Sequence, residues 1–225
     1  MTADSDKHAA ALAAVAEVRE GMLVGIGSGS TVAHLIRLLG ERVRDGLRIE
    51  AVATSIASAD AARAEGIAVR DFADMAAIDL AIDGADEIDA ALVAIKGAGA
   101  AMLREKVVAQ AAARMAVIAD GSKHVARVGA AKLPVEVLPF ARAFVSAQLT
   151  ALGARVGQRA GVVTDNGNII LDAAFGAIAD PPALAAAIAA IPGALGHGLF
   201  VGEVDAAYIA ADGVVTRLER DEMNR

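Results

Sequence analysis

The segment MLVGIGSGSTVAHLIRLLGERV, residues 22–43, leads from a short apolar run through a glycine-rich loop into a helical pattern. Residues 22–27 predict a buried strand. After the loop, apolar side chains recur at the spacing of one helix face: Val32, Leu35, Ile36, Leu39 and Val43. Ser30 or Thr31 is placed to cap the start of this helix. A strand that turns directly into a helix is the first half of a crossover unit, which predicts a parallel sheet.

The same alternation continues to about residue 120. Further strands are predicted at 49–54, 67–72, 79–83 and 116–120, and further helices at 6–21, 58–66 and 102–115. We therefore expect an α/β protein with a Rossmann-like, open, mostly parallel sheet and helices on both of its faces.

The pattern changes after residue 132. A strand at 133–139, a helix at 140–153, a hairpin at 160–172 turning at Asn166-Gly167, a helix at 182–191 and a strand at 198–202 follow in order. This order predicts a small α+β subdomain of ferredoxin-like type over 133–205. A last hairpin, 206–219, turns at Asp212-Gly213 and is expected to return to the main sheet, which gives a catalytic domain of residues 1–132 and 206–225.

Composition excludes several classes of protein. The 225 residues carry a formal net charge of −7 and only 3% aromatic side chains, which argues against a nucleic-acid-binding protein. The absence of cysteine excludes disulfides, thiolate zinc sites and cysteine nucleophiles. The four histidines are scattered without the spacing of a zinc site, so we expect neither a metal nor another cofactor: His8, His34, His124 and His197.

No export or membrane segment is expected. The start MTADSDKHAA has acidic residues where a signal peptide would carry positive charge, which indicates a cytoplasmic protein. Residues 181–202 contain no charged side chain over a length that could span a bilayer. Proline and glycine residues interrupt this stretch, which therefore predicts a buried helix–strand unit.

Polar, mostly glycine-rich loops follow the predicted parallel strands. They are GSGST (27–31), TSIAS (54–58), DGADEID (83–89) and DGSK (120–123). Ligands of open parallel sheets bind beyond the carboxyl ends of the strands. We expect these loops to form the rim of one pocket.

The first loop suits a small phosphate group. Its glycines expose backbone N–H groups at a helix start, and Ser28, Ser30 and Thr31 add hydroxyl donors. A P-loop is excluded because no Gly-Lys-Ser/Thr follows, and a dinucleotide fingerprint fits poorly because Ser30 replaces its third glycine. The alternative is a tight turn with hydroxyl caps and no ligand.

The segment IKGAGAAMLREK, residues 95–106, places a lysine before a second glycine-containing helix start. Lys96 could neutralise a phosphate or polarise a carbonyl, beside the amides of residues 97–99. Glu105 falls about one turn inside the helix. Taken alone, Glu105 reads as an exposed helix carboxylate and Lys123 as a solvated loop lysine.

The acidic loop DGADEID crowds four carboxylates into seven positions, where like charges repel. Glu87 and Asp89 are expected to point outward or to cap the next segment. Together with the phosphate loop and the lysines, this set of acids favours proton transfer on a small phosphorylated compound.

The motifs GSGST, TSIAS, DGADEID, KGAGAAMLREK, ADGSK, LPVEVLP, TDNGN and IPG occur in an order that resembles ribose-5-phosphate isomerase of type A, nearly from end to end. The resemblance implies interconversion of D-ribose 5-phosphate and D-ribulose 5-phosphate through an enediol, in the non-oxidative pentose phosphate pathway, without metal. It also implies a homodimer or homotetramer.

The resemblance further implies roles for individual residues. Glu105 is expected to be the base that carries a proton between C1 and C2, and Asp83 with Asp86 to handle hydroxyl protons and help open the sugar ring. Lys96 is expected to stabilise the enediolate oxygen together with the amides of Gly97 and Gly99. The implied substrate-binding residues are Ser28, Gly29, Ser30, Thr31, Asp83, Gly84, Ala85, Asp86, Lys96, Gly97, Ala98, Gly99 and Lys123, with Lys7 as a further phosphate candidate.

Two positions depart from the family pattern. Ser28 replaces the usual threonine and keeps the hydroxyl, whereas Ala98 replaces a common glycine and would be strained if its φ were positive. The competing functions are a related sugar-phosphate enzyme, such as an amino-sugar phosphate deaminase or another aldose–ketose isomerase, and a non-catalytic sugar-phosphate sensor.

Overall fold

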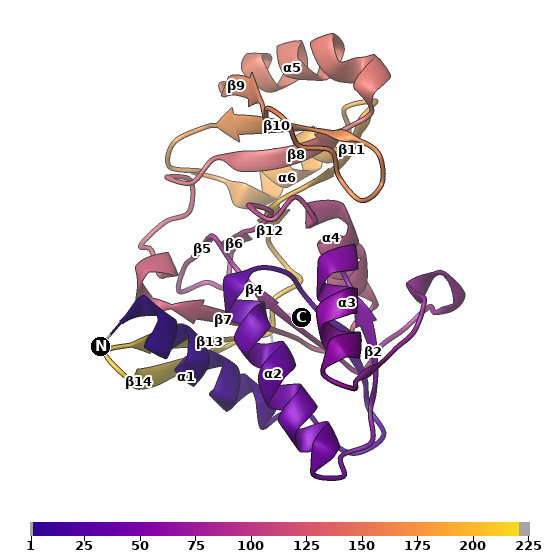
Figure 1. The fold of residues 1–225 in the computed structure, drawn as a ribbon. Coiled ribbons are helices and arrows are strands. Elements are labelled where there is room, and N and C mark those ends of the chain that lie inside the picture. The colour runs from indigo at the N-terminus through magenta and orange to yellow at the C-terminus, as the bar shows by residue number, and fades with distance from the viewer. Residues whose placement is uncertain (1, 221–225) are drawn as a thin grey trace.

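The structure, a computed structural model, describes residues 2–220. Its largest sheet has seven strands in the order β14-β13-β7-β4-β1-β2-β3 (Figure 1). Six of these strands run parallel, and only β14 is antiparallel to its neighbour. The strands are β1 (Leu23–Ile26), β2 (Glu50–Ala53), β3 (Ala68–Val69), β4 (Leu80–Gly84), β7 (Met115–Asp120), β13 (Ala206–Ala211) and β14 (Val214–Glu219).

Helices cover both faces of this sheet, as predicted. Ile82 and Ile118 pack into one apolar cluster with helices α1 (Ala3–Val15) and α2 (Ser30–Arg44). Their neighbours in sequence point to the other face, where Ala81 and Val117 pack with helix α4 (Met102–Ala111). Helix α3 (Ile56–Ala64) packs beside α2 at the β2–β3 edge.

The order of the strands reverses at β1. From β1 the chain builds outward through β2 to β3, and then returns to add β4, β7 and β13 on the other side of β1. In open parallel sheets such a reversal leaves a crevice at the carboxyl ends of the two central strands. The loops after β1 and β4 therefore lie where a ligand can be held.

A second, antiparallel sheet is formed by β8 (Leu133–Val137), β9 (Arg155–Gln158), β10 (Ile169–Ala174) and β11 (Ala194–His197), in the order β11-β8-β10-β9. Helices α5 (Arg142–Ala151) and α6 (Pro181–Ala189) share an apolar cluster with the side chains of β8. The chain order strand–helix–strand–strand–helix–strand is that of a ferredoxin-like unit, as predicted, although its last strand is β11 and not the strand predicted at 198–202.

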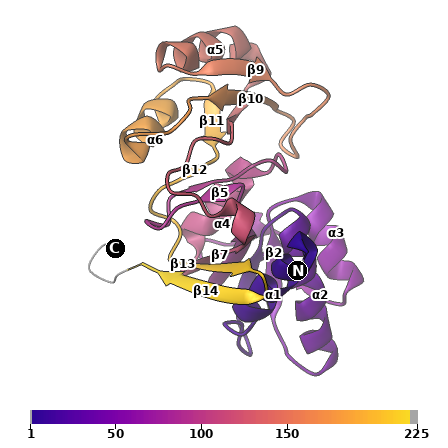
Figure 2. The ribbon, with the colours of Figure 1, turned by 90° about the vertical axis from the view of Figure 1, so that its left-hand side faces the viewer.

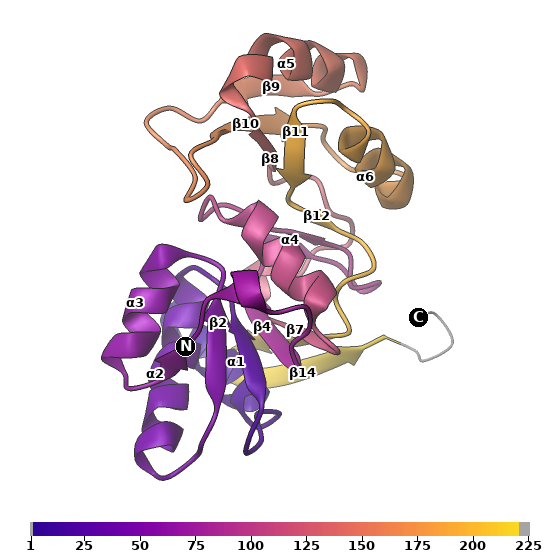
Figure 3. The same ribbon diagram turned by 90° about the vertical axis from the view of Figure 1, so that its right-hand side faces the viewer.

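A third sheet lies between the other two (Figures 2 and 3). It consists of β5 (Glu87–Ile88), β6 (Ala94–Ile95) and β12 (Leu199–Phe200), in the order β12-β6-β5. Its strands come from both of the segments expected to form separate domains, and helix α4 contacts β4 as well as β8 and β11. The division at residues 132 and 206 stays a prediction. Three 3-10 turns complete the described elements: η1 (Phe72–Asp74), η2 (Gly121–Lys123) and η3 (Pro139–Ala141).

Some predicted boundaries are wrong. The first helix ends at Val15 and not at Gly21, because Arg42 Nη1 donates to the carbonyls of Val15 and Val18 at 2.6 and 3.0 Å and stabilises the turn there. Neither Ser30 nor Thr31 caps α2, whose N-cap is Gly29 without a side-chain hydrogen bond.

The two predicted hairpin turns differ. Asp212 and Gly213 have φ of 50° and 79°, as the predicted turn between β13 and β14 requires. Asn166 has no positive φ, and residues 160–163 form no strand; β10 pairs instead with β9, across a longer connection. The side chain of Asn166 accounts for this, because it is held by Glu136 and Arg104 from other elements.

Within residues 2–220, no helix is both long and apolar enough to cross a membrane. In the same part of the chain, no group of three or more histidine or carboxylate side chains is arranged to hold a metal ion.

Candidate active site

A cavity of about 190 Å³ lies at the carboxyl ends of β1 and β4. It is lined by every predicted site residue except Asp83, and by Lys7 as well: Ser28, Gly29, Ser30, Thr31, Gly84, Ala85, Asp86, Lys96, Gly97, Ala98, Gly99, Glu105 and Lys123. The structure thus brings together residues from five separate segments of the chain.

Glu105 lies in the first turn of α4 and is only 3% exposed. Its Oε1 accepts a hydrogen bond of 2.6 Å from Ser28 Oγ. Its Oε2 lies 3.4 Å from Lys96 Nζ and accepts no hydrogen bond within the described residues. Glu105 is therefore not the exposed helix carboxylate that its sequence position alone would suggest, but a buried carboxylate that lines the cavity, with one oxygen held by Ser28 and the other paired with Lys96.

Lys96 follows β6 and is 2% exposed. Its ammonium lies 2.7 Å from Asp83 Oδ2 and also donates to the carbonyl of Gly84. The Phe200 ring lies beneath it, 5.4 Å from Nζ to the ring centroid. The ion pair with Asp83, the hydrogen bond to the Gly84 carbonyl and the contact with the Phe200 ring hold the positive charge of Lys96 at one place in the cavity wall.

Asp83 lies behind the cavity and holds the phosphate loop in place. Its Oδ1 accepts from the amides of Ser28 and Gly84 at 3.0 and 2.7 Å. A Cβ added at Gly27 would come within 1.9 Å of Asp83 Oδ1, so only glycine permits this approach.

The charged groups of the site shift one another's pKa values. Burial, and then the nearby Glu105 carboxylate, raise the pKa of Asp83 to about 7, although Lys96 acts in the opposite direction. Burial alone would lower the pKa of Lys96, but Asp83 and Glu105 outweigh it and raise that pKa above its ordinary value. Burial also raises the pKa of Asp86, whose Oδ2 accepts from the Ala98 amide at 2.9 Å.

The part of the cavity at the start of α2 suits an anion. Ser30 and Thr31 begin α2, whose first N–H groups have no acceptor inside the helix. Lys7 from α1 reaches this point and donates to Ser30 Oγ at 3.1 Å. Lys123 lines the same cavity from η2.

Other predictions about these loops need correction. Glu87 does not point outward: it is 5% exposed and accepts from the amides of Gly129 and Ala131, both at 2.6 Å. Ala98 has no positive φ, whereas Ala100 has φ of 66°. The possible strain at Ala98 is therefore absent. Asp89 caps the following turn through the amides of Ala91 and Val93, as expected.

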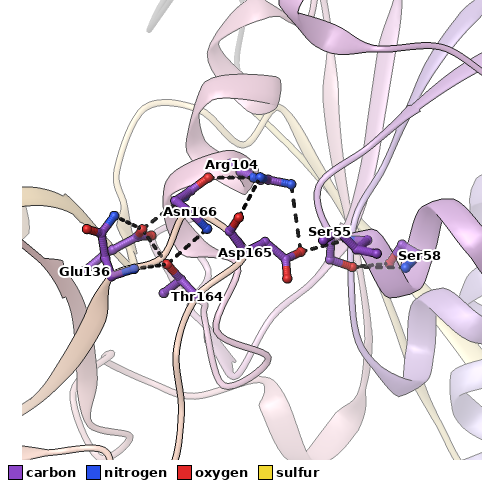
Figure 4. Close-up of polar contacts among 9 residues, drawn as sticks. Ser55, Ser58, Arg104, Glu136, Thr164, Asp165 and Asn166 are labelled. Carbon is purple, nitrogen blue, oxygen red and sulfur yellow. Dashed lines mark hydrogen bonds and ion pairs between the residues drawn. The ribbon is translucent and has the colours of Figure 1, made fainter.

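The TSIAS loop lines a neighbouring cavity of about 320 Å³ and not the smaller one. Ser55 caps α3, and Ile56 donates its amide to Asp165 Oδ2 at 2.8 Å (Figure 4). Ser28, Gly29 and Gly99 line both cavities.

Sequence reasoning missed the side chains that support the site from distant segments. Phe200 lies between two lysines, with Lys106 Nζ 4.1 Å from its ring centroid. Arg159 hydrogen-bonds the Gly97 and Ala98 carbonyls, both at 3.0 Å. Neither residue belongs to a motif; the only sequence signal was that Phe200 is one of five phenylalanines in an aromatic-poor chain.

Comparison with known proteins assigns a family. A sequence profile described as Ribose 5-phosphate isomerase A (phosphoriboisomerase A) matches residues 50–213. The chain is 52% identical over 222 residues to ribose-5-phosphate isomerase A of Sphingopyxis alaskensis, covering 97% of each chain. It is 49% identical to that of Methylorubrum extorquens, covering 94% of each.

Solved structures agree with this assignment. Ribose 5-phosphate isomerase A from Neisseria gonorrhoeae superposes with a TM-score of 0.93 at 36% identity, over 98% of this chain and 99% of that one. A D-ribose-5-phosphate isomerase in complex with phospho-erythronic acid gives a TM-score of 0.95 at 35% identity, over 98% and 100%. With the sequence, the fold and the cavity in agreement over nearly its whole length, the chain belongs to the ribose-5-phosphate isomerase A family.

Proposed function

We propose that the protein interconverts D-ribose 5-phosphate and D-ribulose 5-phosphate through an enediol, with Glu105 as the base. One observation carries the proposal: a buried carboxylate faces the cavity with one oxygen held by Ser28 and the other free of hydrogen bonds within the described residues. The relatives named above act on this substrate by their names, and one of them binds phospho-erythronic acid, which also carries a phosphate.

The substrate is expected to place its phosphate at the start of α2, near Lys7 and Lys123, and its C1 and C2 atoms near Glu105. A helix N-terminus with two ammonium groups favours a dianionic phosphate. Both the start of α2 and Glu105 line this one cavity, which supports the proposed placement.

Proton transfer then follows from the placement of Glu105. In the open-chain aldose, Glu105 removes the proton from C2, a C1–C2 double bond forms, and the electron pair of the carbonyl moves to O1. Protonation of O1 gives the enediol. Loss of the O2 proton forms the C2 carbonyl, and Glu105 returns its proton to C1, so the proton and electron count balances.

The negative charge that develops on oxygen during these reaction steps needs to be stabilised. Lys96 and the backbone amides of Gly97 and Gly99 are donors that the fold places at the cavity before the substrate arrives, and such donors stabilise a developing oxyanion. Asp86 lines the cavity and is proposed to exchange hydroxyl protons. Asp83 is proposed to act with it, chiefly by holding Lys96 and the phosphate loop.

We further propose, from the family alone, that the protein is a cytoplasmic homodimer or homotetramer of the non-oxidative pentose phosphate pathway that needs no cofactor. The domain division at 132 and 206 belongs to the same set of proposals. The four-stranded sheet uses only residues between these limits.

The test is ketose formation from D-ribose 5-phosphate in excess chelator, with wild-type protein, Glu105→Gln and the control Glu41→Gln, which changes an exposed carboxylate on α2. We expect activity in the wild type and the control and its loss in a folded Glu105→Gln protein. Ammonia release from glucosamine 6-phosphate in place of ketose formation would favour a deaminase. Binding of ribose 5-phosphate without turnover in the wild type would favour a sensor.

A further inference from the structure

The loop beside Lys96 forms a tight turn whose central peptide can adopt two orientations. The Ala100 amide donates to the Gly97 carbonyl at 3.0 Å, which makes Ala98 and Gly99 the central residues. Neither of these two has a positive φ. Glycine at the third position of a turn also tolerates positive φ, so the peptide between Ala98 and Gly99 could flip unless something holds it.

Arg159, directly after β9, is placed to hold this peptide. Its Nη1 donates to the carbonyl oxygens of Gly97 and Ala98, both at 3.0 Å. The other edge of the guanidinium grips the Asp172 carboxylate on β10, with Nε–Oδ2 at 3.0 Å and Nη2–Oδ1 at 2.5 Å. The side chains of Arg159 and Asp172 are 20% and 17% exposed, so little water competes for these bonds.

The two carbonyls fix the direction of the amides. In a trans peptide the N–H points opposite to the C=O. The peptide that begins at Gly97 shows this: its carbonyl accepts from Arg159, while its Ala98 amide donates to Asp86 on the other side. In the next peptide, the Ala98 carbonyl is held by Arg159, which directs the Gly99 amide toward the cavity that Gly99 lines. This amide donates to no acceptor in residues 2–220.

We propose that Arg159 is a positioning residue, which selects the turn orientation in which the Gly99 amide is aimed at the reacting oxygen of the substrate. The inference deepens the proposed isomerase function and rests on it. Arg159 itself contacts no substrate in this account; it acts through the Ala98–Gly99 peptide. A lysine cannot replace it, because one ammonium cannot bind both a carboxylate in a fork and two carbonyls.

The kinetic test compares Arg159→Met and Arg159→Lys with the control Arg155→Met, which removes an exposed arginine from the adjoining strand β9. Loss of an oxyanion donor lowers kcat by about a hundredfold to a thousandfold, and misorientation by part of that. We expect kcat of Arg159→Met to fall about tenfold to a hundredfold with KM within about threefold, most of this loss to persist in Arg159→Lys, and no change in Arg155→Met.

The binding of two ligands distinguishes a loss of positioning by Arg159 from general damage to the site. Phospho-erythronic acid carries a carboxylate where the enediolate carries its charge, whereas ribitol 5-phosphate has the phosphate and hydroxyls but no such charge. We expect Arg159→Met to weaken the first by about the same factor as kcat/KM and to leave the second unchanged. Equal loss for both ligands, or wild-type kcat in folded Arg159→Met or Arg159→Lys protein, would overturn the proposal.

Amide hydrogen exchange of residues 97–101, measured by mass spectrometry on the same proteins, tests the role of Arg159 independently of the proposed isomerase function. Exchange there is expected to be faster in Arg159→Met than in the wild type or Arg155→Met, and equal exchange in all three overturns the role of Arg159 even if the wild type has no isomerase activity. A wild type that forms no ketose overturns the proposed function.

Discussion

Two buried glutamates, Glu105 and Glu136, show how similar burial serves different ends. They are 3% and 0% exposed, and each has an Oε2 without a hydrogen-bond partner in the described residues. Glu136 Oε1 accepts from three neutral groups of the β9–β10 connection, at 2.8, 3.0 and 2.8 Å: Thr164 Oγ1, Asn166 Nδ2 and Asn168 Nδ2 (Figure 4). Glu105 Oε1 accepts from a single hydroxyl, and its Oε2 lies near an ammonium.

The surroundings of each carboxylate decide its role. Glu136 is absent from the lining of the cavity, and its donors tie one loop to the smaller sheet. Glu105 lines the cavity beside Lys96 and the loop of residues 97–99. A buried carboxylate alone therefore does not indicate an active site. An active site also needs a cavity that the carboxylate lines and a second charged group close to it.

Glu105→Gln gives the largest expected effect on this comparison. Because a glutamine cannot accept the proton from C2, kcat should fall about a thousandfold while thermal stability changes little. Steady-state kinetics and a thermal melt measure both. A residual kcat within tenfold of the wild type, in folded protein, would move the base to another residue.

Glu136→Leu should give the reverse result. The change leaves the hydroxyl of Thr164 and the amides of Asn166 and Asn168 without their acceptor, which should cost about 2–4 kcal/mol of unfolding free energy. Urea unfolding measures the loss, and kcat of the folded fraction should stay within a few-fold of the wild type. Glu136→Gln, which keeps an acceptor oxygen, is the matched control and should lose less.

Asp83→Asn tests the electrostatics of the active cavity through pH. The folded state raises the pKa of Asp83 from its ordinary value of 3.8 to about 7, so it binds the proton more tightly than the unfolded chain does. The stability that this supplies is complete below about pH 4 and is lost as the pH rises to about 7.

The unfolding free energy of the wild type should therefore fall relative to Asp83→Asn between about pH 4 and pH 7. Urea unfolding at several pH values measures the difference. A difference that stays flat across this range, or that changes in the opposite direction, contradicts the account. The control is Asp60→Asn, which changes an exposed carboxylate. Asp205→Asn is not suitable, because Asp205 accepts a hydrogen bond from the Met115 amide.

Arg104→Met should give the smallest effect. Arg104 precedes Glu105 and binds the Asn166 side chain at 2.8 Å and the Asp165 carbonyl at 3.0 Å (Figure 4). Its side chain is 37% exposed, so removal should cost about 1 kcal/mol or less and change kcat only a few-fold. A loss of kcat as large as that expected for Arg159→Met would show that this contact also positions α4.

Much of the fold could be predicted because it follows from local patterns in the sequence. Strand–helix alternation predicts the parallel sheet, and the change of pattern after residue 132 predicts the antiparallel one. Strands of two residues, such as β5 and β6, carry no periodicity that a sequence could reveal. Asn166-Gly167 looks like a hairpin turn by itself, but contacts from Glu136 and Arg104 give its segment another course.

The candidate site divides in the same way. The lining residues 28–31, 84–86 and 123 belong to loops that follow predicted strands, so their meeting could be foreseen, whereas residues 96–99 follow β6, which no periodicity predicts. Glu87 could not be placed, because the amides that bury it belong to Gly129 and Ala131. Arg159 and Phe200 were missed for a similar reason, since each reaches the site from a segment with no motif of its own.

The central claim, a proton carried by Glu105 through an enediol, is tested most directly by deuterium incorporation. Ribose 5-phosphate is held at equilibrium with the enzyme in D₂O for many turnovers, and C2 is examined by NMR. The account predicts that deuterium accumulates at C2 of ribose 5-phosphate with the wild type and not with Glu105→Gln. Equilibration with ribulose 5-phosphate without deuterium at C2 would indicate a direct hydride shift, and equal incorporation by both proteins would assign the base to another residue.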